Sequence, residues 1–436
     1  MHAKTRLRAA LFPAALFPAA LLPAAVLATT LLTACGDEDS DAEQTSNAAR
    51  PGQRLASWAV SPQDYNQTLP GSALPPPPPM GFANQSIRQV MHLSLGGTNA
   101  RVRFSNLFGT EPLALAGAHI ARAGAAPSAI DATSDTELRF AGQASVTIPA
   151  GQEQWSDPST LQVTSAEDVA VTLFLSGSVP VSTVHTEARQ TEFVTAGNAL
   201  SAPSFSAPET RTANYWVTGI DVTSPSGGGA IVTFGDSITD GVGSTPDANH
   251  RYPNYLFERV RTDPKLSGYS VIDEGISGNR ILHDVAGPNA LGRFERDVLQ
   301  QSGASHVIIL IGINDLGFSG FVLDQAVTAP DVTGGLETLV SQAKAKGLRV
   351  YLATLTPLQG TMAPYYSEQT ETQRGAVNAW IRGNKVVDGI IDFDRAVQDP
   401  QNPLAMNPAF DSGDHLHPSD AGYQVMANAI DLSLLH

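Results

Sequence analysis

After residue 229 the chain alternates short apolar segments with amphipathic ones, and this alternation restricts the fold more than any other feature of the sequence. The apolar segments have the length of strands and lie at 230–234, 270–273, 306–311, 349–353 and 389–392. The amphipathic segments have helical periodicity and lie at 253–261, 290–300, 336–345, 373–382 and 421–434. Strands that alternate with helices in this way imply a mostly parallel sheet covered on both faces. We therefore predict an α/β domain over residues 230–436, with its reactive loops at the carboxyl ends of the strands.

The preceding part, from about residue 55 to 224, has the two-residue periodicity of strands and no convincing amphipathic helix. Residues 100–105 alternate apolar and polar side chains, as expected for a strand with one face in water. The segment 87–95 is a second candidate, and the Gly-Gly-Thr-Asn turn between the two segments predicts a hairpin. Further strand candidates lie at 138–140, 145–148 and 169–175. We predict an all-β domain, a β-sandwich or jelly roll, over residues 55–224.

The N-terminus has the features of an export signal. Three basic residues precede an uncharged stretch at 9–34, which leads through Leu-Thr-Ala to Cys35. This ending resembles the lipobox of bacterial lipoproteins, in which the cysteine is lipidated and becomes the mature N-terminus. The stretch is long enough to span a bilayer, but its internal prolines favour a signal peptide over an uncleaved anchor. We predict a lipoprotein signal peptide at 1–34 and an acidic disordered tether at 35–54.

Charge and cysteine content restrict the kinds of partner and of covalent link that the chain can have. The chain carries 42 Asp+Glu against 26 Lys+Arg, a formal net charge of −16, which argues against nucleic acid as a partner. Cys35 is the only cysteine, so neither intramolecular disulfides nor thiolate metal clusters can form. We expect an exported protein that is lipid-anchored to the bacterial cell envelope, on the cell membrane or the outer membrane, facing away from the cytoplasm.

Three of the predicted strands end in loops that carry residues suited to acyl transfer. The first ends in Gly-Asp-Ser, which places Ser237 in a tight turn with free backbone N–H groups nearby, the setting that a nucleophile needs. A phosphate-binding loop would need Gly-Lys-Ser/Thr, and no lysine is present. The second loop contains Gly278, whose N–H can approach a substrate closely, and the third contains Asn314, whose amide can donate to a developing oxyanion. Each residue alone is also compatible with an ordinary turn.

The C-terminal sequence Asp-His-Leu-His adds a carboxylate and two imidazoles. Asp414 and His417 are three residues apart, which places both side chains on one side of a tight turn or of a first helical turn. The carboxylate can then hold one imidazole nitrogen while the other faces a serine. His415 and His417 could instead be a metal pair, but the sequence offers no third ligand at recognisable spacing. We favour the Asp–His interpretation and expect His415 to serve packing or hydrogen bonding.

Together, and in this order, these motifs resemble the four blocks of the SGNH/GDSL hydrolase superfamily. The resemblance covers the whole second predicted domain and implies a flavodoxin-like, three-layer parallel-sheet fold. It implies that Ser237 is the nucleophile, that His417 is the general base and acid, and that Asp414 orients His417. It also implies an oxyanion hole made of the N–H groups of Ser237 and Gly278 and the side chain of Asn314.

Further motifs, such as Arg-Val-Arg-Phe-Ser-Asn at 101–106 and Asn-Ala-Trp-Ile-Arg at 378–382, are similar to an acetylxylan-esterase-like subgroup of bacterial and fungal GDSL proteins. The resemblance implies a serine esterase without metal or organic cofactor that forms an acyl-enzyme, with acetyl groups on an extracellular polysaccharide as the first choice of substrate. The alternatives are a lipid or lysophospholipid acylhydrolase and a catalytically inert surface lipoprotein that binds glycan. Asp273 departs from the family pattern, since many relatives carry Asn there, and its local hydrogen bonding is left open.

Overall fold

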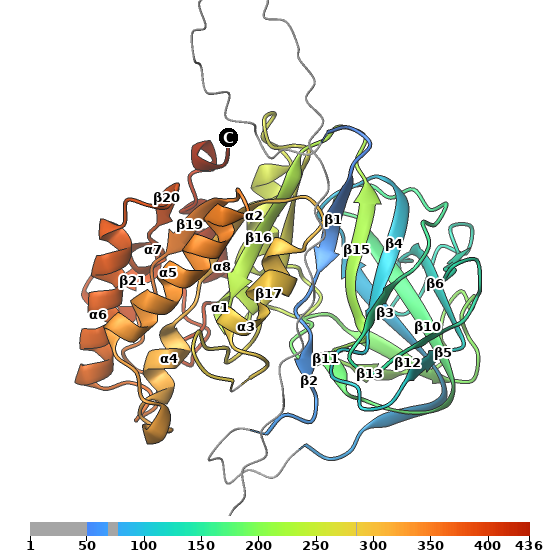
Figure 1. Ribbon diagram of the computed structural model, residues 1–436, viewed down its shortest axis with the longest axis horizontal. Helices are drawn as coiled ribbons and strands as arrows, with labels where there is room; N and C mark the ends of the chain where they lie inside the picture. The colour runs from blue at the N-terminus through green and yellow to red at the C-terminus, as the bar shows by residue number, and fades with distance from the viewer. Residues whose placement is uncertain (1–49, 69–76, 285) are drawn as a thin grey trace, which may run out of the picture. The chain divides into compact units, whose positions relative to one another are not determined.

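Figure 1 shows the computed structural model of the chain, which describes residues 50–68, 77–284 and 286–436. The predicted signal peptide, Cys35 and most of the predicted tether lie outside the described residues. The described residues belong to one compact unit, in which a β-rich region at 54–223 precedes a parallel-sheet region at 229–436. Within these ranges, no helix combines the length and the apolar character needed to cross a membrane.

The β-rich region contains two large antiparallel sheets that share one apolar core, so its predicted mostly-β character is confirmed. Six strands form one sheet in the order β13 (Glu209–Arg211), β12 (Glu192–Ala196), β3 (Gly81–His92), β10 (Asp168–Pro180), β6 (Gly117–Arg122) and β7 (Thr136–Glu137). Four strands form the other, in the order β1 (Arg54–Ala59), β15 (Val217–Thr223), β4 (Thr98–Ser105) and β9 (Glu153–Trp155). Small sheets combine β14 (Asn214–Tyr215), β11 (Thr183–His185) and β2 (Gln63–Asp64), and β5 (Leu113–Leu115) and β8 (Val146–Ile148). Ile87 and Val171 of the first sheet meet Val102 and Ile220 of the second in the core.

The predicted hairpin of segments 87–95 and 100–105 is wrong, because the two segments belong to different sheets. β3 pairs with β10 and β12, whereas β4 pairs with β15 and β9. After β3 the Ser94 N–H donates to the Ser57 carbonyl of β1 at 3.0 Å, so the chain that leaves β3 is hydrogen-bonded to a strand of the other sheet. Periodicity identifies a strand but not its partner. The candidate at 138–140 is not a strand either, since β7 ends at Glu137.

Five parallel strands form the sheet that the strand–helix alternation predicts. Their order is β17 (Tyr269–Gly275), β16 (Gly229–Gly235), β18 (Ala304–Leu310), β19 (Arg349–Ala353) and β20 (Gly389–Ile391). The five predicted strands are confirmed within about two residues at each end. Because β16 lies between β17 and β18, the loops that follow these three strands lie side by side at one edge of the sheet.

Helices cover both faces of this sheet. On one face, Phe234 and Ile309 share an apolar cluster with side chains of α3 (Ala290–Phe294), η1 (Glu295–Leu299), α5 (Ala329–Ala345) and α6 (Glu368–Gly383). On the other face, Ile308 and Tyr351 pack with side chains of α2 (Tyr252–Val260), α7 (Phe393–Val397) and α8 (Asp420–Asn428).

Four helix predictions need correction. The segment 373–382 is the second part of α6, which begins at Glu368. The segment 290–300 is α3 followed by the single π-helical segment η1, not one α-helix. The segment 336–345 is the second part of α5, which begins at Ala329. The segment 421–434 is helical only to Asn428 and continues, after a break, as the short 3₁₀ helix η3 (Leu432–Leu435).

The β-rich and parallel-sheet regions meet along a buried contact that we call the seam. Along β1, Leu55 belongs to the core of the β-rich region, while Ala56 and Ala59 belong to the core of the parallel-sheet region. The Ala56 N–H donates to the Ser302 carbonyl at 2.8 Å across the seam. Strand β1 therefore packs against both cores. Polar side chains also meet across the seam, since Ser61 Oγ donates to Glu274 Oε2 at 2.6 Å.

Candidate active site

Ser237 stands at the carboxyl end of β16, which lies between β17 and β18, in the first turn of α1 (Ser237–Asp240). Asp236 caps this short helix, since its Oδ1 accepts from the Ile238 N–H at 3.1 Å. A Cβ at Gly235 would overlap the Thr239 hydroxyl and the Leu310 carbonyl, so only glycine allows the turn to fold this tightly. The Ser237 side chain is held at the edge of the sheet in a nearly buried position, 5% exposed.

The structure brings Asp414, His417 and Ser237 together in one line of hydrogen bonds. His417 Nε2 lies 2.8 Å from Ser237 Oγ, and His417 Nδ1 lies 2.5 Å from Asp414 Oδ2. The second carboxylate oxygen of Asp414 accepts from the N–H groups of Leu416 and His417, at 2.9 and 2.8 Å. The short loop that carries the pair is thereby folded around the carboxylate, which fixes the imidazole opposite the serine.

The charge state of Asp414 determines which nitrogen of His417 can act on the serine. Partial burial raises the pKa of Asp414, but the hydrogen bonds from the His417 ring and from the N–H groups of His417 and Leu416 outweigh it and hold this pKa well below its ordinary value. Asp414 is therefore a carboxylate at neutral pH and can only accept. The proton between the two side chains then stays on His417 Nδ1, which leaves Nε2 as an acceptor for the Ser237 hydroxyl.

His415 takes part in a separate pair. Its Nδ1 lies 2.7 Å from Asp411 Oδ2, and its backbone has a φ of +66°. The structure thus gives His415 the hydrogen-bonding role that the sequence analysis expects, and His415 and His417 each face their own carboxylate. Among residues 50–68, 77–284 and 286–436, no three His, Cys, Asp or Glu side chains gather in a way that could hold a metal ion.

The two predicted oxyanion donors lie on the loops that flank Ser237. Gly278 follows β17, has a φ of +76°, and its N–H has no hydrogen-bond partner among the described residues. Asn314 lies in the first turn of α4 (Ile313–Phe318), which follows β18. Its Nδ2 donates to the Asn279 carbonyl at 3.1 Å, which uses one of the two amide hydrogens. The loops after β16, β17 and β18 therefore bring a hydroxyl, a free backbone N–H and an amide to one edge of the sheet.

The family of the parallel-sheet region follows from its sequence. Residues 233–425, which include all of these site residues, match the GDSL-like lipase/acylhydrolase family. The chain carries a GDSL-like lipase/acylhydrolase domain. The fold and the order of the four motifs agree with this membership, and we call residues 229–436 the GDSL domain from here on.

The two solved structures described next each cover less than half of this chain. An acetylxylan esterase from Geobacillus stearothermophilus is 26% identical, with a TM-score of 0.37 over 48% of this chain and 94% of that one. A GDSL-like lipase from Bacteroides thetaiotaomicron VPI-5482 is 21% identical, with a TM-score of 0.33 over 47% of this chain and 87% of that one. Among curated proteins, none matches the chain.

Tyr365 is a site residue of the GDSL domain that the sequence analysis missed. Its hydroxyl donates to Asn314 Oδ1 at 2.9 Å, so the Asn314 amide is held from both ends. Burial raises the pKa of Tyr365 well above its ordinary value, which keeps the phenol protonated as a donor. A Cβ at Gly317 would overlap the Tyr365 ring, so this glycine allows the close approach. Tyr365 lies in a loop without a motif, and nothing in its sequence surroundings points to Asn314.

The sequence analysis also missed that Asp236, next to Ser237, has a shifted pKa. Its Oδ2 is buried and has no hydrogen-bond partner among the described residues. Burial raises the pKa of Asp236 to about 7, and the negative charge of Asp315 acts in the same direction, against the opposing effects of the Ile238 N–H, His417 and Arg293. The GDSL domain therefore carries a buried carboxyl group that changes charge near neutral pH directly beside Ser237.

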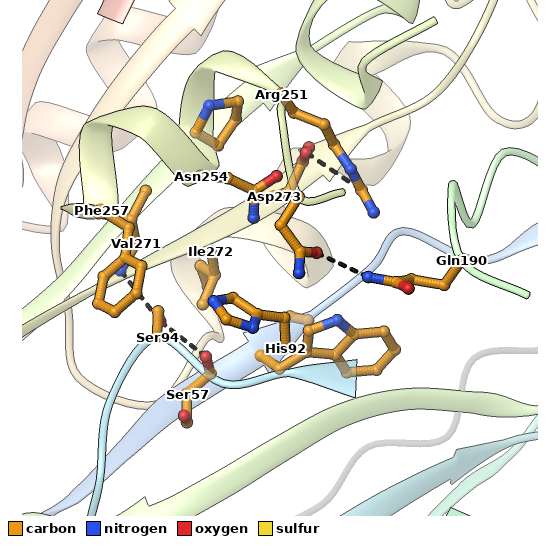
Figure 2. A pocket seen from close by; sticks show the side chains of 14 residues that line it. Ser57, His92, Ser94, Gln190, Arg251, Asn254, Phe257, Val271, Ile272 and Asp273 are labelled. Carbon is orange, nitrogen blue, oxygen red and sulfur yellow. Dashed lines mark hydrogen bonds and ion pairs between the residues drawn. The ribbon is translucent and has the colours of Figure 1, made fainter. Parts of the chain in front are cut away.

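The departure of Asp273 from the family pattern has a local explanation at the seam. Asp273 Oδ1 accepts from the Gly275 N–H at 3.0 Å, and Oδ2 lies 3.5 Å from Arg251 Nη1. Burial raises the pKa of Asp273 to about 6, although the positive charge of Arg251 opposes this effect. Both side chains line a cavity of about 40 Å³, and Figure 2 shows them there together with Ser57 of β1. A carboxylate suits this position because Arg251 faces it.

Proposed function

We propose that the chain is a serine esterase that hydrolyses carboxylic esters through an acyl-enzyme. The observation that carries the proposal is the continuous line from Asp414 through His417 to the Ser237 hydroxyl, with contacts of 2.5 and 2.8 Å. This line lies beside the Gly278 N–H and the Asn314 amide, which can bind a negatively charged oxygen. Membership of the GDSL-like lipase/acylhydrolase family supports the same reaction class.

In the first half of the reaction, Ser237 Oγ attacks the ester carbonyl carbon while His417 Nε2 takes the hydroxyl proton. The carbonyl oxygen becomes an oxyanion, which accepts hydrogen bonds from the N–H groups of Ser237 and Gly278 and from Asn314 Nδ2. When the tetrahedral intermediate collapses, the bond to the alkoxy oxygen breaks and His417 returns its proton to the leaving alcohol. Water then attacks the acyl-enzyme with His417 again as base, which releases the acid and restores Ser237.

Covalent labelling tests whether the site is active. A fluorophosphonate should label the wild-type chain at Ser237 and leave Ser237→Ala unlabelled, and the variant should lose hydrolysis of p-nitrophenyl acetate. A folded Ser237→Ala variant that keeps wild-type esterase activity would contradict the proposal. A wild-type chain that is neither labelled nor active would support the inert glycan-binding lipoprotein instead.

We propose acetyl groups on an extracellular polysaccharide as the ester that is cleaved. The support is the similarity of motifs in both regions to the acetylxylan-esterase-like subgroup. Acetate release from acetylated xylan, measured for a chain that starts after Cys35 and for Ser237→Ala, tests the choice. If the chain still cleaves p-nitrophenyl acetate but releases no acetate from acetylated xylan, the xylan assignment is wrong. Fatty-acid release from lysophospholipid vesicles would then identify the lipid alternative.

We further propose that residues 1–34 are a signal peptide and that lipidated Cys35 anchors the enzyme to the bacterial cell envelope, facing away from the cytoplasm. The support is the Leu-Thr-Ala-Cys sequence at the end of an uncharged stretch. In a bacterial host, the wild-type chain should sediment with membranes, and mass spectrometry should find an acylated cysteine at its N-terminus. Cys35→Ala should abolish the acylation. An unmodified, unprocessed N-terminus in the membrane fraction would favour the uncleaved anchor.

A further inference from the structure

A buried ion pair links the β-rich region to the end of the nucleophile helix. His185, the last residue of β11, lies with its Nε2 3.0 Å from Oδ1 of Asp240, the last residue of α1. The two side chains are 2% and 1% exposed. Asp240 is three residues after Ser237, so the pair ends on the short helix that carries the nucleophile. Isolated charges are costly to bury, and a buried pair of this kind suggests a specific task.

The other carboxylate oxygen of Asp240 holds the loop that contains Gly278. Asp240 Oδ2 accepts from the backbone N–H of Ser277 at 2.9 Å and from the Ser277 hydroxyl at 2.8 Å. A Cβ at Gly275 would overlap the backbone of Asp240, so the loop and the helix are in close contact at this point. Ser277 immediately precedes Gly278, and its bonds to Asp240 restrict where the free Gly278 N–H points.

His185 is fixed at both ring nitrogens, and both contacts require it to donate. Nδ1 lies 3.0 Å from the Ser61 carbonyl, and a carbonyl and a carboxylate oxygen can only accept, so the ring that satisfies both is the imidazolium. Burial lowers the pKa of His185, but Asp240 and the Ser61 carbonyl outweigh burial and raise the pKa above its ordinary value. Among the charged groups nearby, Arg251 opposes this rise, and the negative charge of Glu187 lies on the side that favours it.

We propose that His185 of the β-rich region is a positioning residue for ester hydrolysis, which acts through Asp240 on the loop that carries the Gly278 oxyanion donor. The proposal rests on the esterase function proposed above. The imidazolium of His185 fixes one oxygen of the Asp240 carboxylate, and the other oxygen accepts the two Ser277 hydrogen bonds. The β-rich region thereby contributes to transition-state binding without contacting the substrate.

The test compares His185→Ala with His185→Gln in hydrolysis of p-nitrophenyl acetate. Loss of a whole oxyanion donor costs about 10²–10³ in kcat, so displacement of one donor in His185→Ala should lower kcat roughly 10- to 100-fold. KM should stay within about twofold, because the ground-state carbonyl depends little on the oxyanion donors. Affinity for phenylboronic acid, which forms a tetrahedral adduct on an active-site serine, should fall by a similar factor. His185→Gln keeps a donor toward Asp240 and should recover part of the lost kcat.

The matched control is His119→Ala. His119 pairs with Asp135 at 2.9 Å within the β-rich region and has no bond to the GDSL domain, so kcat and boronate affinity should stay at wild-type values. If His185→Ala does not fold, Ser277→Ala decides, because it removes only the hydroxyl bond to Asp240 Oδ2. Ser277→Ala should then lower kcat and boronate affinity together, with KM unchanged.

The outcomes separate the two proposals. A folded His185→Ala with wild-type kcat and boronate affinity would overturn the positioning role and leave the esterase function standing. The same result for Ser277→Ala, where His185→Ala does not fold, would also overturn it. A loss in KM alone, or equal losses in His185→Ala and His119→Ala, would show a merely structural effect and overturn it too. A wild-type chain without Ser237-dependent turnover would overturn both proposals.

Discussion

At the scale of single residues, the amide of Asn314, the proposed oxyanion donor, is held by hydrogen bonds at both ends. Tyr365 donates to its Oδ1 at 2.9 Å, and its Nδ2 donates to the Asn279 carbonyl at 3.1 Å. Because a carbonyl oxygen can only accept, the Asn279 contact fixes which end of the amide carries the hydrogens. The remaining hydrogen is available to a substrate oxygen.

We therefore expect Asn314→Ala to lower kcat by about 10²–10³, and Tyr365→Phe by roughly 5- to 10-fold because it removes one buried hydrogen bond. KM should change little in both variants. Steady-state kinetics with p-nitrophenyl acetate measures the effect. Tyr366→Phe is the matched control, because its hydroxyl bonds Gln359 and not Asn314. Equal kcat values for Tyr365→Phe and Tyr366→Phe would refute the role of Tyr365.

The two neighbouring His–Asp pairs allow a second prediction at this scale. Asp414→Asn puts an amide where the carboxylate accepts from His417 Nδ1, so the ring tautomer that serves Ser237 is no longer favoured, and kcat should fall roughly 10²- to 10⁴-fold. Asp411→Asn changes the equivalent partner of His415, which lies 2.7 Å away, and should leave kcat close to wild type. A larger loss of kcat for Asp411→Asn than for Asp414→Asn would show that the Asp411–His415 pair, and not the Asp414–His417 pair, serves catalysis.

At the scale of elements, the turn from β16 into α1 depends on Gly235. An added methyl group would meet the Leu310 carbonyl of the neighbouring strand, which cannot move without disturbing the sheet. Gly235→Ala should therefore lower the free energy of unfolding by about 1–3 kcal/mol and reduce kcat. Gly375→Ala in α6 meets nothing within 4 Å and should stabilise the chain by up to about 1 kcal/mol. Urea denaturation compares the two, and a stable, fully active Gly235→Ala would contradict the argument.

The predictability of the fold also differs between elements. The apolar strands of the parallel sheet are buried on both faces, so their sequences alone locate them. The start of α5 is set by a capping box between Thr328 and Asp331. The glycines at 334 and 335 are poor helix formers, so helical periodicity does not indicate this first part of the helix. The partners of β3 and β4 depend on backbone bonds to distant segments, which strand periodicity does not encode.

The candidate site was predictable where a short motif carries it and unpredictable where the fold supplies a partner. Ser237, Asp414 and His417 stand in recognisable spacing, and the structure brings them together. Tyr365 and His185 come from segments without a motif. A loop brings Tyr365 to Asn314, and the contact between the two regions brings His185 to Asp240. Their contacts are tertiary, so one sequence without its fold gives no signal for them.

At the scale of the whole molecule, the described residues bury several carboxyl groups that hold their protons to unusually high pH. Burial raises the pKa of Asp236 to about 7 and those of Asp273 and Asp315 to about 6. Burial, with the charge of Asp297, raises the pKa of Glu274 well above its ordinary value. Glu274 lies at the seam, where Ser61 Oγ is 2.6 Å from its Oε2. Separating the two regions would expose Glu274 to water, so the raised pKa of this group depends on an intact seam.

These groups set the pH dependence of stability. In the unfolded chain, carboxyl groups lose their protons near about pH 4, whereas the folded chain keeps those of Asp236, Asp273 and Asp315 to higher pH. Between about pH 4 and 7 these three groups bind more protons in the folded chain, so they make its free energy of unfolding fall as the pH rises. Burial lowers the pKa of His306 to about 4, and this single group acts in the opposite direction. Asp414 has the opposite sign, because its lowered pKa gives stability that is lost as the pH falls below about 4.

We expect the wild-type free energy of unfolding, measured by urea denaturation, to be larger at pH 5 than at pH 7.5. Asp236→Asn removes one of the retained protons, and each full proton contributes a slope of about 1.4 kcal/mol per pH unit. The difference in the free energy of unfolding between pH 5 and pH 7.5 should therefore be measurably smaller in Asp236→Asn than in the wild type. Asp131→Asn is the control, since hydrogen bonds from Thr133 lower the pKa of Asp131 and it does not titrate in this window. A wild-type stability that rises from pH 5 to 7.5 would contradict the summed effect of the buried carboxyl groups. An unchanged slope in Asp236→Asn would show that Asp236 is ionised throughout this range, and its pKa would then not lie near 7.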